Sequence, residues 1–404
     1  MPETPIEALL IPPRAMPPAR RSAFSWRSKQ ARGVIYQLLV LSLVAFLVWL
    51  LVSSTLANMK ARGIQSGFDF LLQTAGFDIG EEITGYDSNQ PYWRAFLAGV
   101  VNTLRVALIG IVLTTILGTL LGIGRFSRNA LVRGICYAYV ECFRNIPVLL
   151  QLLMWYLIFT EYLPSIDAAL TLGNLLFVSK NGVSFPFPAW SPGYLVALAG
   201  LLFGAVAAFV YARSARKAFD LSGKIRPVLW VSLALVVGGV VIGWLAGGAP
   251  WHWMIPVKNE VQVEGGGALS PEYMALLLGL VLYTSAFVAE VVRGGIASVA
   301  AGQHEASASL GLSQRLSMRL VILPQALRVI IPPMTNQFLN LTKNSSLAVA
   351  VGYPDVVSIA NTSLNQTGRA VECILIIMLI YLTLSLLTSA FMNWFNARAA
   401  IKER

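Results

Sequence analysis

The sequence predicts an all-α polytopic membrane protein with about eight transmembrane helices. Of the 404 residues, 56% are hydrophobic and only 12% are charged, whereas ordinary soluble domains carry about 25% charged residues. Several apolar runs also approach or exceed the roughly 20 residues with which a helix crosses a bilayer. Most of the chain is therefore expected to lie in a membrane.

The apolar runs give the expected spans in chain order. They lie near residues 34–54, 96–123, 135–160, 194–212, 228–247, 274–296, 337–357 and 371–394. The seventh is the least apolar, because Gln337, Asn340, Lys343 and Asn344 fall in its first half. We retain it because it gives an even number of spans, and because polar groups inside a helix bundle usually line a pathway.

Basic residues gather in alternate loops between these spans. Those after the second and fourth spans are Arg125, Arg128, Arg133, Arg213, Arg216, Lys217, Lys224 and Arg226. The other loops are mostly acidic or neutral, with Asp78, Glu81 and Asp87 in the first of them. The positive-inside rule therefore predicts that both termini are cytoplasmic. The net charge of +11 follows from this topology and does not indicate nucleic-acid binding, which needs a basic groove with interleaved aromatics.

The N-terminal residues are rich in proline and arginine and lack an apolar core. We expect residues 1–33 to form a disordered cytoplasmic tail. The first span is too long for a removed signal peptide and has no clear small-residue cleavage site. Residues 34–95 are therefore expected to hold a retained transmembrane helix and a periplasmic loop.

A polar segment between the sixth and seventh spans carries a spaced motif. Glu305-Ala306-Ser307 is followed by Gly311 and, further on, by Leu323-Pro324. The small residues after Glu305 suit a helix, Gly311 takes a positive φ at low cost and can end that helix, and Pro324 marks the next break. Taken without its spacing, such a segment is a short amphipathic connector on the membrane surface.

The spacing resembles the EAA loop of ABC importer permeases. In that family the loop is a pair of short cytoplasmic helices that docks into a groove on an ATPase subunit. The resemblance implies a cytoplasmic coupling loop over residues 298–333. Its coupling residues would be Glu305, Ala306, Ser307, Gly311, Leu323 and Pro324. Ser307 stands where the family pattern has a second alanine, which is a conservative change.

No Gly-x-x-x-x-Gly-Lys-Ser/Thr motif occurs in the sequence. Since a P-loop needs this pattern to cradle phosphates, the chain is not expected to bind ATP or to be an enzyme, and ATP hydrolysis is assigned to a separate subunit. Cys136, Cys142 and Cys373 lack the spacing of a metal site, and His252 and His304 lie too far apart to form one. We therefore expect no cofactor, metal or disulfide.

Four further segments look like the polar amino acid branch of the family. They are Asn102–Arg105, Phe143–Gln151, Ala289–Ile296 and Lys343–Leu347. A two-span insert near residues 164–272 interrupts the expected permease domain, residues 96–397. This insert resembles the permease subunits of broad-specificity, general L-amino-acid importers.

The resemblance implies an ABC type I importer permease fold, a location in the bacterial inner membrane and a set of partners. The partners would be an ATPase dimer, a second, related but non-identical permease chain and a periplasmic amino-acid-binding protein. An ion-coupled secondary amino acid transporter is the alternative, although we find no matched halves with broken helices. Vanadate would stop uptake by an ATP-driven importer, and a protonophore or sodium removal would stop uptake by an ion-coupled one.

Charged residues inside the expected spans are candidates for a substrate pathway. Glu141 and Arg144 lie three residues apart, on one face of a helix, and Glu290 and Arg293 repeat this arrangement. They form structural ion pairs, or they mark the path of a zwitterion, which needs a cation for its carboxylate and an anion for its amine. The sequence leaves both interpretations open. The candidate pathway residues are Glu141, Arg144, Glu290 and Lys343.

Two Gly-x-x-x-Gly patterns also lie within expected spans. One pairs Gly118 with Gly122 and the other pairs Gly239 with Gly243. Small residues at this spacing let helix backbones approach each other closely in a membrane. Because the pattern is frequent by chance, it predicts close helix packing and no further function.

Overall fold

The computed structural model describes residues 29–61, 63, 66–81, 83–173, 175–259 and 263–399. Residues 1–28 of the tail that the sequence predicts over residues 1–33 lie outside this part of the chain. Two compact units divide the chain, Met1–Ser66 and Gly67–Arg404. The first contains helix α1 (Lys29–Ala61), which is long and apolar enough to cross a membrane and covers the first expected span.

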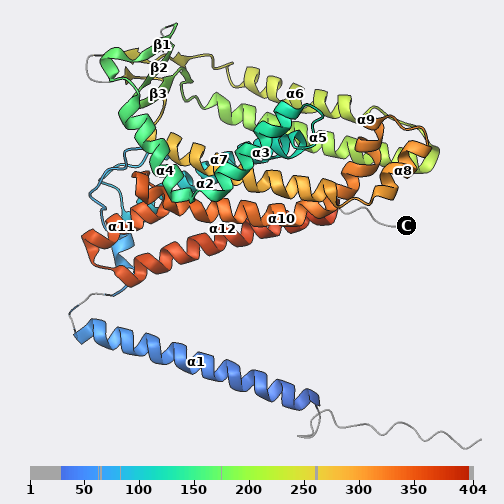
Figure 1. The fold of residues 1–404 in the computed structure, drawn as a ribbon. Coiled ribbons are helices and arrows are strands. Elements are labelled where there is room, and N and C mark those ends of the chain that lie inside the picture. Colours follow the sequence, from blue (N-terminus) through green and yellow to red (C-terminus); the bar gives the residue numbers. More distant parts are fainter. Residues whose placement is uncertain are drawn as a thin grey trace, which may run out of the picture. The chain divides into compact units, whose positions relative to one another are not determined.

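The second unit is organised around four long helices (Figure 1). They are α2 (Tyr92–Gly124), α7 (Pro271–Ala297), α10 (Leu323–Asn344) and α12 (Ala370–Ala399). α7 packs against α2 and α10, and α10 packs against α12. Among the described residues, seven helices qualify as membrane spans and a bent helix pair can supply an eighth. The predicted all-α polytopic fold is confirmed.

Glycines bring α2 and α7 together. A Cβ atom on Gly118 would lie 2.5 Å from Cγ1 of Val288, and one on Gly122 would lie 2.8 Å from the carbonyl oxygen of Ala289. Real side chains do not approach other atoms this closely, so neither position has room for a Cβ. The first Gly-x-x-x-Gly pattern is therefore a close contact between helices, as predicted.

The third expected span, residues 135–160, is not one straight helix. It consists of α3 (Ala130–Asn145) and α4 (Val148–Leu157), which meet at an angle of 103°. The π-helical turn η2 (Ile158–Tyr162) continues α4. The chain therefore turns a corner inside this span.

Pro147 explains the corner. Proline lacks an amide proton and disfavours the helical conformation in the residue before it, and Ile146 is extended, with φ −98° and ψ 128°. The side chain of Gln151 is buried and donates from Nε2 to the carbonyl oxygens of Phe143 and Ile146, at 2.9 Å each. Gln151 thereby satisfies two acceptors that the broken helix leaves without amide partners.

The seventh span begins far earlier than the sequence indicates. Instead of residues 337–357, a continuous but irregular helix runs from Gln314 to Val351. Its parts are α9 (Gln314–Ser317), the π-helical turn η4 (Met318–Ile322), α10 and the 3-10 helix η5 (Ser345–Val351). Three arginines interrupt the apolar residues of its first part, which is why the sequence assigned that part to a cytoplasmic loop. These arginines are Arg315, Arg319 and Arg328.

The insert forms a helical hairpin with short strands on either side of it in the chain. Helices α5 (Gly193–Ser222) and α6 (Val228–Ala246) pack on each other. An antiparallel sheet has the order β1–β2–β3–β8, and β4 pairs with β5 and β6 with β7. The strands are β1 (Leu170–Leu172), β2 (Leu176–Ser179), β3 (Gly182–Phe185), β4 (Phe187–Pro188), β5 (Trp253–Met254), β6 (Val257–Lys258), β7 (Val263–Glu264) and β8 (Gly267–Leu269). They are too short for alternation to reveal them in the sequence.

Glycines also hold the hairpin together. A Cβ atom on Gly243 would lie 2.6 Å from the carbonyl oxygen of Val196, and one on Gly247 would lie 2.5 Å from that of Gly193. The second Gly-x-x-x-Gly pattern is therefore a close helix contact too. Away from this contact, large apolar side chains of both helices are exposed, among them Phe203, Phe209 and Trp230.

Candidate functional site

The expected coupling loop forms a helix, a turn and a second helix. Helix α8 (Ala301–Ser309) carries Glu305 and Ala306 at exposed positions. Among the described residues, no side chain pairs with the carboxylate of Glu305. The exposed Leu310 follows directly. An unpaired carboxylate on α8 and an exposed leucine at the end of the same helix are suited to contact with another protein.

Gly311 makes the turn. Its φ is +69°, a left-handed conformation that costs other residues roughly 1–2 kcal/mol. Its amide donates to the carbonyl oxygen of Ala308 at 2.9 Å, and the amide of Leu312 donates to that of Ser307 at 3.1 Å. The turn therefore satisfies carbonyls at the end of α8, as a left-handed glycine commonly does.

Ser307 joins the two helices of the loop. It is buried, and its hydroxyl lies 2.6 Å from that of Ser317 and donates to the carbonyl oxygen of His304 at 2.8 Å. The serine that replaces the second alanine of the family pattern thus fixes α8 to the end of α9. The sequence gives no sign of this contact, because nothing in the motif points to Ser317.

Leu323 and Pro324 lie apart from Glu305, at the start of α10. The amide of Leu323 donates to Met318, five residues back, in a π-type turn. This wider turn precedes Pro324, which has no amide proton to continue the regular ladder. Leu323 lines an apolar groove of about 510 Å³ between α2, α7, α10 and α12.

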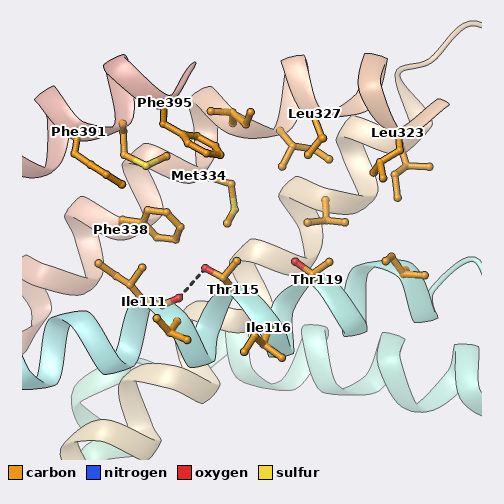
Figure 2. A pocket seen from close by; sticks show the side chains of 17 residues that line it. Ile111, Thr115, Ile116, Thr119, Leu323, Leu327, Met334, Phe338, Phe391 and Phe395 are labelled. Atoms are coloured by element: carbon orange, nitrogen blue, oxygen red, sulfur yellow. Dashed lines mark hydrogen bonds between the residues drawn. The ribbon is translucent and has the colours of Figure 1, made fainter. Parts of the chain in front are cut away.

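Figure 2 shows this groove from close by. Its walls are aliphatic and aromatic, with Leu327, Met334, Phe338 and Phe391 prominent among them. The hydroxyl of Thr115 is already bonded to the carbonyl oxygen of Ile111, at 2.7 Å. No charged side chain lines the groove, so it does not offer a route for a zwitterion.

The charged residues of the spans meet around Glu290. Arg293 donates to Oε1 of Glu290 from Nε at 3.0 Å and from Nη2 at 2.5 Å. Arg125, at the end of α2, donates from Nη1 to Oε2 of the same carboxylate. Arg144 on α3 is the third cation, with its Nη1 4.0 Å from that oxygen. Positive charge therefore exceeds negative charge in this cluster.

The geometry corrects the expected partner of Arg144. The neighbour Glu141 makes no ion pair among the described residues, and its backbone carbonyl accepts from Asn145 at 2.7 Å. Arg144 instead extends over the ring of Phe287, 5.4 Å from its centre, toward Glu290. The sequence also does not predict that Arg125 belongs to this cluster, because its position indicates a cytoplasmic loop.

Arg144 differs from the other two arginines of the cluster. Arg125 and Arg293 both hydrogen-bond to Glu290, whereas Arg144 has no hydrogen bond within the described chain and its side chain is 35% exposed. Its donors are therefore available to an anion. Lys343 does not join this cluster, since it is exposed near the end of α10 and makes no ion pair with a described residue.

A second ion pair lies near the start of α7, and the sequence did not single it out as a pair. Arg105 donates to Oε1 of Glu81 at 2.6 Å and lies 4.2 Å from the ring centre of Tyr273. Asn102 donates to the carbonyl oxygens of Glu81 and Pro354. The Asn102–Arg105 motif thus ties α2 to two loops beside a polar cavity of about 440 Å³.

Comparisons with known proteins identify the family of the chain. Residues 200–401 match the family described as binding-protein-dependent transport system inner membrane component. The General L-amino acid transport system permease protein AapQ of Rhizobium johnstonii is 42% identical over 96% of this chain and 98% of its own length. The putative amino-acid ABC transporter permease protein YhdX of Escherichia coli is 40% identical over 95% and 98%.

A third relative has a narrower substrate range in its name. It is the Glutamate/glutamine/aspartate/asparagine transport system permease protein BztB of Rhodobacter capsulatus, which is 39% identical over 92% of this chain and 95% of its own length. All of these descriptions name transport components. The chain belongs to the family of binding-protein-dependent transport system inner membrane components.

Proposed function

We propose that the chain is the transmembrane permease subunit of an ATP-driven importer, and that it carries L-amino acids of several kinds across the bacterial inner membrane. The α8–α9 loop carries this proposal, because it presents the free carboxylate of Glu305 next to a turn that Gly311 makes. The names of full-length relatives support amino acids as the substrate class.

The loop is built to transmit movement. The hydroxyl contact between Ser307 and Ser317 fixes α8 to α9, and α9 continues through η4 into α10. α10 packs against α7 and α12. An ATPase subunit that binds and displaces α8 would therefore move a membrane-spanning helix. In this role Glu305, Ala306 and Gly311 form the docking surface, and Ser307, Leu323 and Pro324 attach it to the bundle.

The remaining partners follow from the same proposal. ATP hydrolysis lies on a separate ATPase dimer, a periplasmic protein delivers the amino acid, and a related but non-identical permease chain completes the membrane part. With this arrangement the α8–α9 loop and both termini face the cytoplasm. The basic loops of the sequence support this orientation.

Arg144 is the residue that we assign to the substrate carboxylate. Arg125 and Arg293 hydrogen-bond to Glu290, while the guanidinium of Arg144 has free donors. Glu141, one turn earlier on α3, would face the substrate amine. Lys343 lies away from this pair and is the weakest of the candidate pathway residues.

Substitutions of Arg144 test this assignment. Arg144→Lys keeps the charge but loses the planar fork that binds a carboxylate with two hydrogen bonds, so uptake should fall in this variant and in Arg144→Ala. Arg133→Lys, at an exposed position on the same helix, is the control. If Glu141→Gln combined with Arg144→Gln transports at the wild-type rate, Arg144 has no substrate role.

Uptake into membrane vesicles tests the function itself. Vesicles that contain the complete transporter should accumulate L-amino acids only with ATP, and vanadate should stop this uptake. A protonophore or the removal of sodium should leave it intact when ATP is supplied. Uptake that survives ATP depletion but stops with the protonophore would show an ion-coupled secondary transporter instead.

A further inference from the structure

The two helices of the insert differ in length, and the difference lies at one end. α5 has 30 residues and α6 has 19, which correspond to about 45 Å and about 28 Å of helix. The two helices are level where Gly193 meets Gly247, and Gly204 of α5 lies against Leu235 of α6. Continuing this antiparallel register, the first residue of α6 lies beside residues 211–212. The segment 213–222 therefore projects beyond α6.

This projecting segment is strongly basic. Arg213, Arg216 and Lys217 share one face of α5, because they are three and four residues apart. Gly223 then ends the helix with a φ of +67°, and Lys224 and Arg226 lie on the stretch that returns to α6. All five cations are exposed, and none has an ion-pair partner within the described ranges.

Apolar side chains accompany these cations. Phe219 and Leu221 flank the basic face of the helix and are 54% and 88% exposed, and Ile225 on the returning stretch is 88% exposed. Asp220 is the only acidic residue between positions 213 and 226. Cations mixed with exposed apolar side chains suit the boundary between lipid headgroups and acyl chains.

The length of α5 favours a lipid over a protein as the partner of the basic segment. A bilayer is about 30 Å thick in its hydrocarbon core and about 40–45 Å with its headgroups. At about 45 Å, α5 is long enough to pass through the hydrocarbon core and extend into the headgroup layer of one leaflet. Its basic segment therefore lies at the depth of the phosphates, and the exposed outer faces of α5 and α6 leave lipids free to approach it.

We propose that residues 213–226 bind the headgroups of anionic phospholipids in the cytoplasmic leaflet. The proposal rests on the cytoplasmic orientation of this end, which belongs to the proposed function. Each lysine or arginine near an anionic surface strengthens such binding, and Asp220 is the only acidic residue within residues 213–226. The hairpin is then an anchor that recruits particular lipids to one flank of the transporter.

Lipid selectivity of the full chain, in its transporter complex, tests the proposal. The complex is placed in phosphatidylcholine vesicles with spin-labelled phosphatidylglycerol or spin-labelled phosphatidylcholine, and electron paramagnetic resonance measures the motionally restricted fraction of each. Arg216→Gln with Lys217→Gln should lower the preference for phosphatidylglycerol by up to roughly 30-fold. Lys180→Gln with Lys258→Gln removes two charges near the other end of the hairpin and should change it little.

Two further measurements protect the result from a folding artefact. Arg213→Lys with Arg216→Lys preserves the charge and should keep the lipid preference, because the attraction to an anionic leaflet depends on the number of lysine and arginine charges near its surface. The preference of the wild-type chain should also fall as salt rises from 0.05 to 0.5 M. If the lipid preference of the wild-type chain does not change with salt concentration, the proposal is overturned, and this test needs no variant.

The test separates this site from protein docking and from import. If the Gln variant keeps its lipid preference, the proposal is overturned, and simultaneous loss of the ATPase subunit would identify the segment as a protein-docking surface. The lipid measurement needs neither ATP nor amino acid. A negative result therefore leaves vanadate-sensitive uptake as an independent test of the transport function.

Discussion

The α2–α7 pair and the α5–α6 pair are both held by glycines, but the glycines meet different partners. Gly118 and Gly122 of α2 receive the branched side chains of Val288 and Val292 on α7. Between α5 and α6, the glycines meet backbone atoms of the other helix, as Gly200 and Gly239 do, so backbone lies against backbone. α7 is buried along much of its length, whereas α5 and α6 are exposed except at their mutual contact.

This difference shows what the same sequence pattern does in two settings. In the core pair, the close approach leaves the other faces of both helices free for α10, α3 and α11 (Val356–Thr367), so one contact supports several others. In the hairpin, each helix has mainly its partner and the lipid. We therefore expect damage in the core to spread through the bundle, and damage in the hairpin to remain local.

The largest effect is expected from Gly118→Val. The new side chain would clash with Val288 and with the carbonyl oxygen of Ser285, and overpacking of a core typically costs about 1–3 kcal/mol or more. Membrane levels and uptake should both fall strongly. Gly134→Val on α3, where no atom lies within 4 Å of the added Cβ, is the control. Normal uptake by Gly118→Val would contradict the described packing.

Gly200→Val is the corresponding change in the hairpin. The added side chain would meet the carbonyl oxygen of Gly239, so the two helices should separate and trypsin should cut faster at the turn between them. Uptake should stay near the wild-type rate, because distant sites act independently. Gly238→Val, where the added Cβ has open space, should change neither quantity. Abolished uptake in Gly200→Val would mean that the hairpin is part of the transport machinery.

A pH titration sharpens the comparison. Asp355 lies between two membrane spans and is buried in the core. Burial raises the pKa of Asp355 from 3.8 to about 6, against hydrogen bonds from the amide of Ser358 and the hydroxyl of Tyr381. The folded state therefore binds the proton more tightly, and the free energy of unfolding should fall by up to roughly 3 kcal/mol as pH rises from about 4 to 6.

Asp355→Asn should remove this slope while it keeps an oxygen to cap α11. Thermal unfolding of both proteins in detergent, between pH 4 and 8, measures the difference. Asp78→Asn, at an exposed position, serves as the control and should retain the wild-type slope. If the wild type becomes more stable relative to Asp355→Asn as pH rises, the assigned direction is wrong.

The smallest expected effect on stability is that of Gly311→Val, at about 1–2 kcal/mol from the strained φ. Its effect on coupling should be larger, because the turn shapes the docking surface. Membrane levels should stay normal while substrate-stimulated ATP hydrolysis falls. Gly76→Val imposes the same φ of +69° in open space outside the loop and should leave hydrolysis intact. Normal stimulated hydrolysis in Gly311→Val would refute the coupling role.

The sequence predicted the long apolar helices and the helix end at Gly311, because composition and local spacing determine both. It did not predict the corner at Pro147, although the proline was visible. The angle depends on Gln151, whose side chain supplies the missing hydrogen bonds. The start of the seventh span was missed for a related reason, since local charge suggested a loop where the helix is continuous.

Tertiary partners could not be predicted at all. An ion pair between Arg144 and Glu141 is one of the two interpretations that the sequence leaves open, but the structure brings Glu290 and Arg125 from two other helices to Arg144. Sequence spacing reports only contacts within an element. The Ser307–Ser317 contact and the Arg105–Glu81 pair join different segments, so sequence spacing could not predict them.

The helix from Gln314 to Val351 also has a mechanical consequence. Its 38 residues would span about 57 Å as a regular α-helix, and the serine contact clamps one end of it to α8. A tilt of only about 5° would displace the far end by about 5 Å over such a length. If the helix moves as one body, a small rotation at the loop becomes a displacement of several ångströms on the other side of the bilayer.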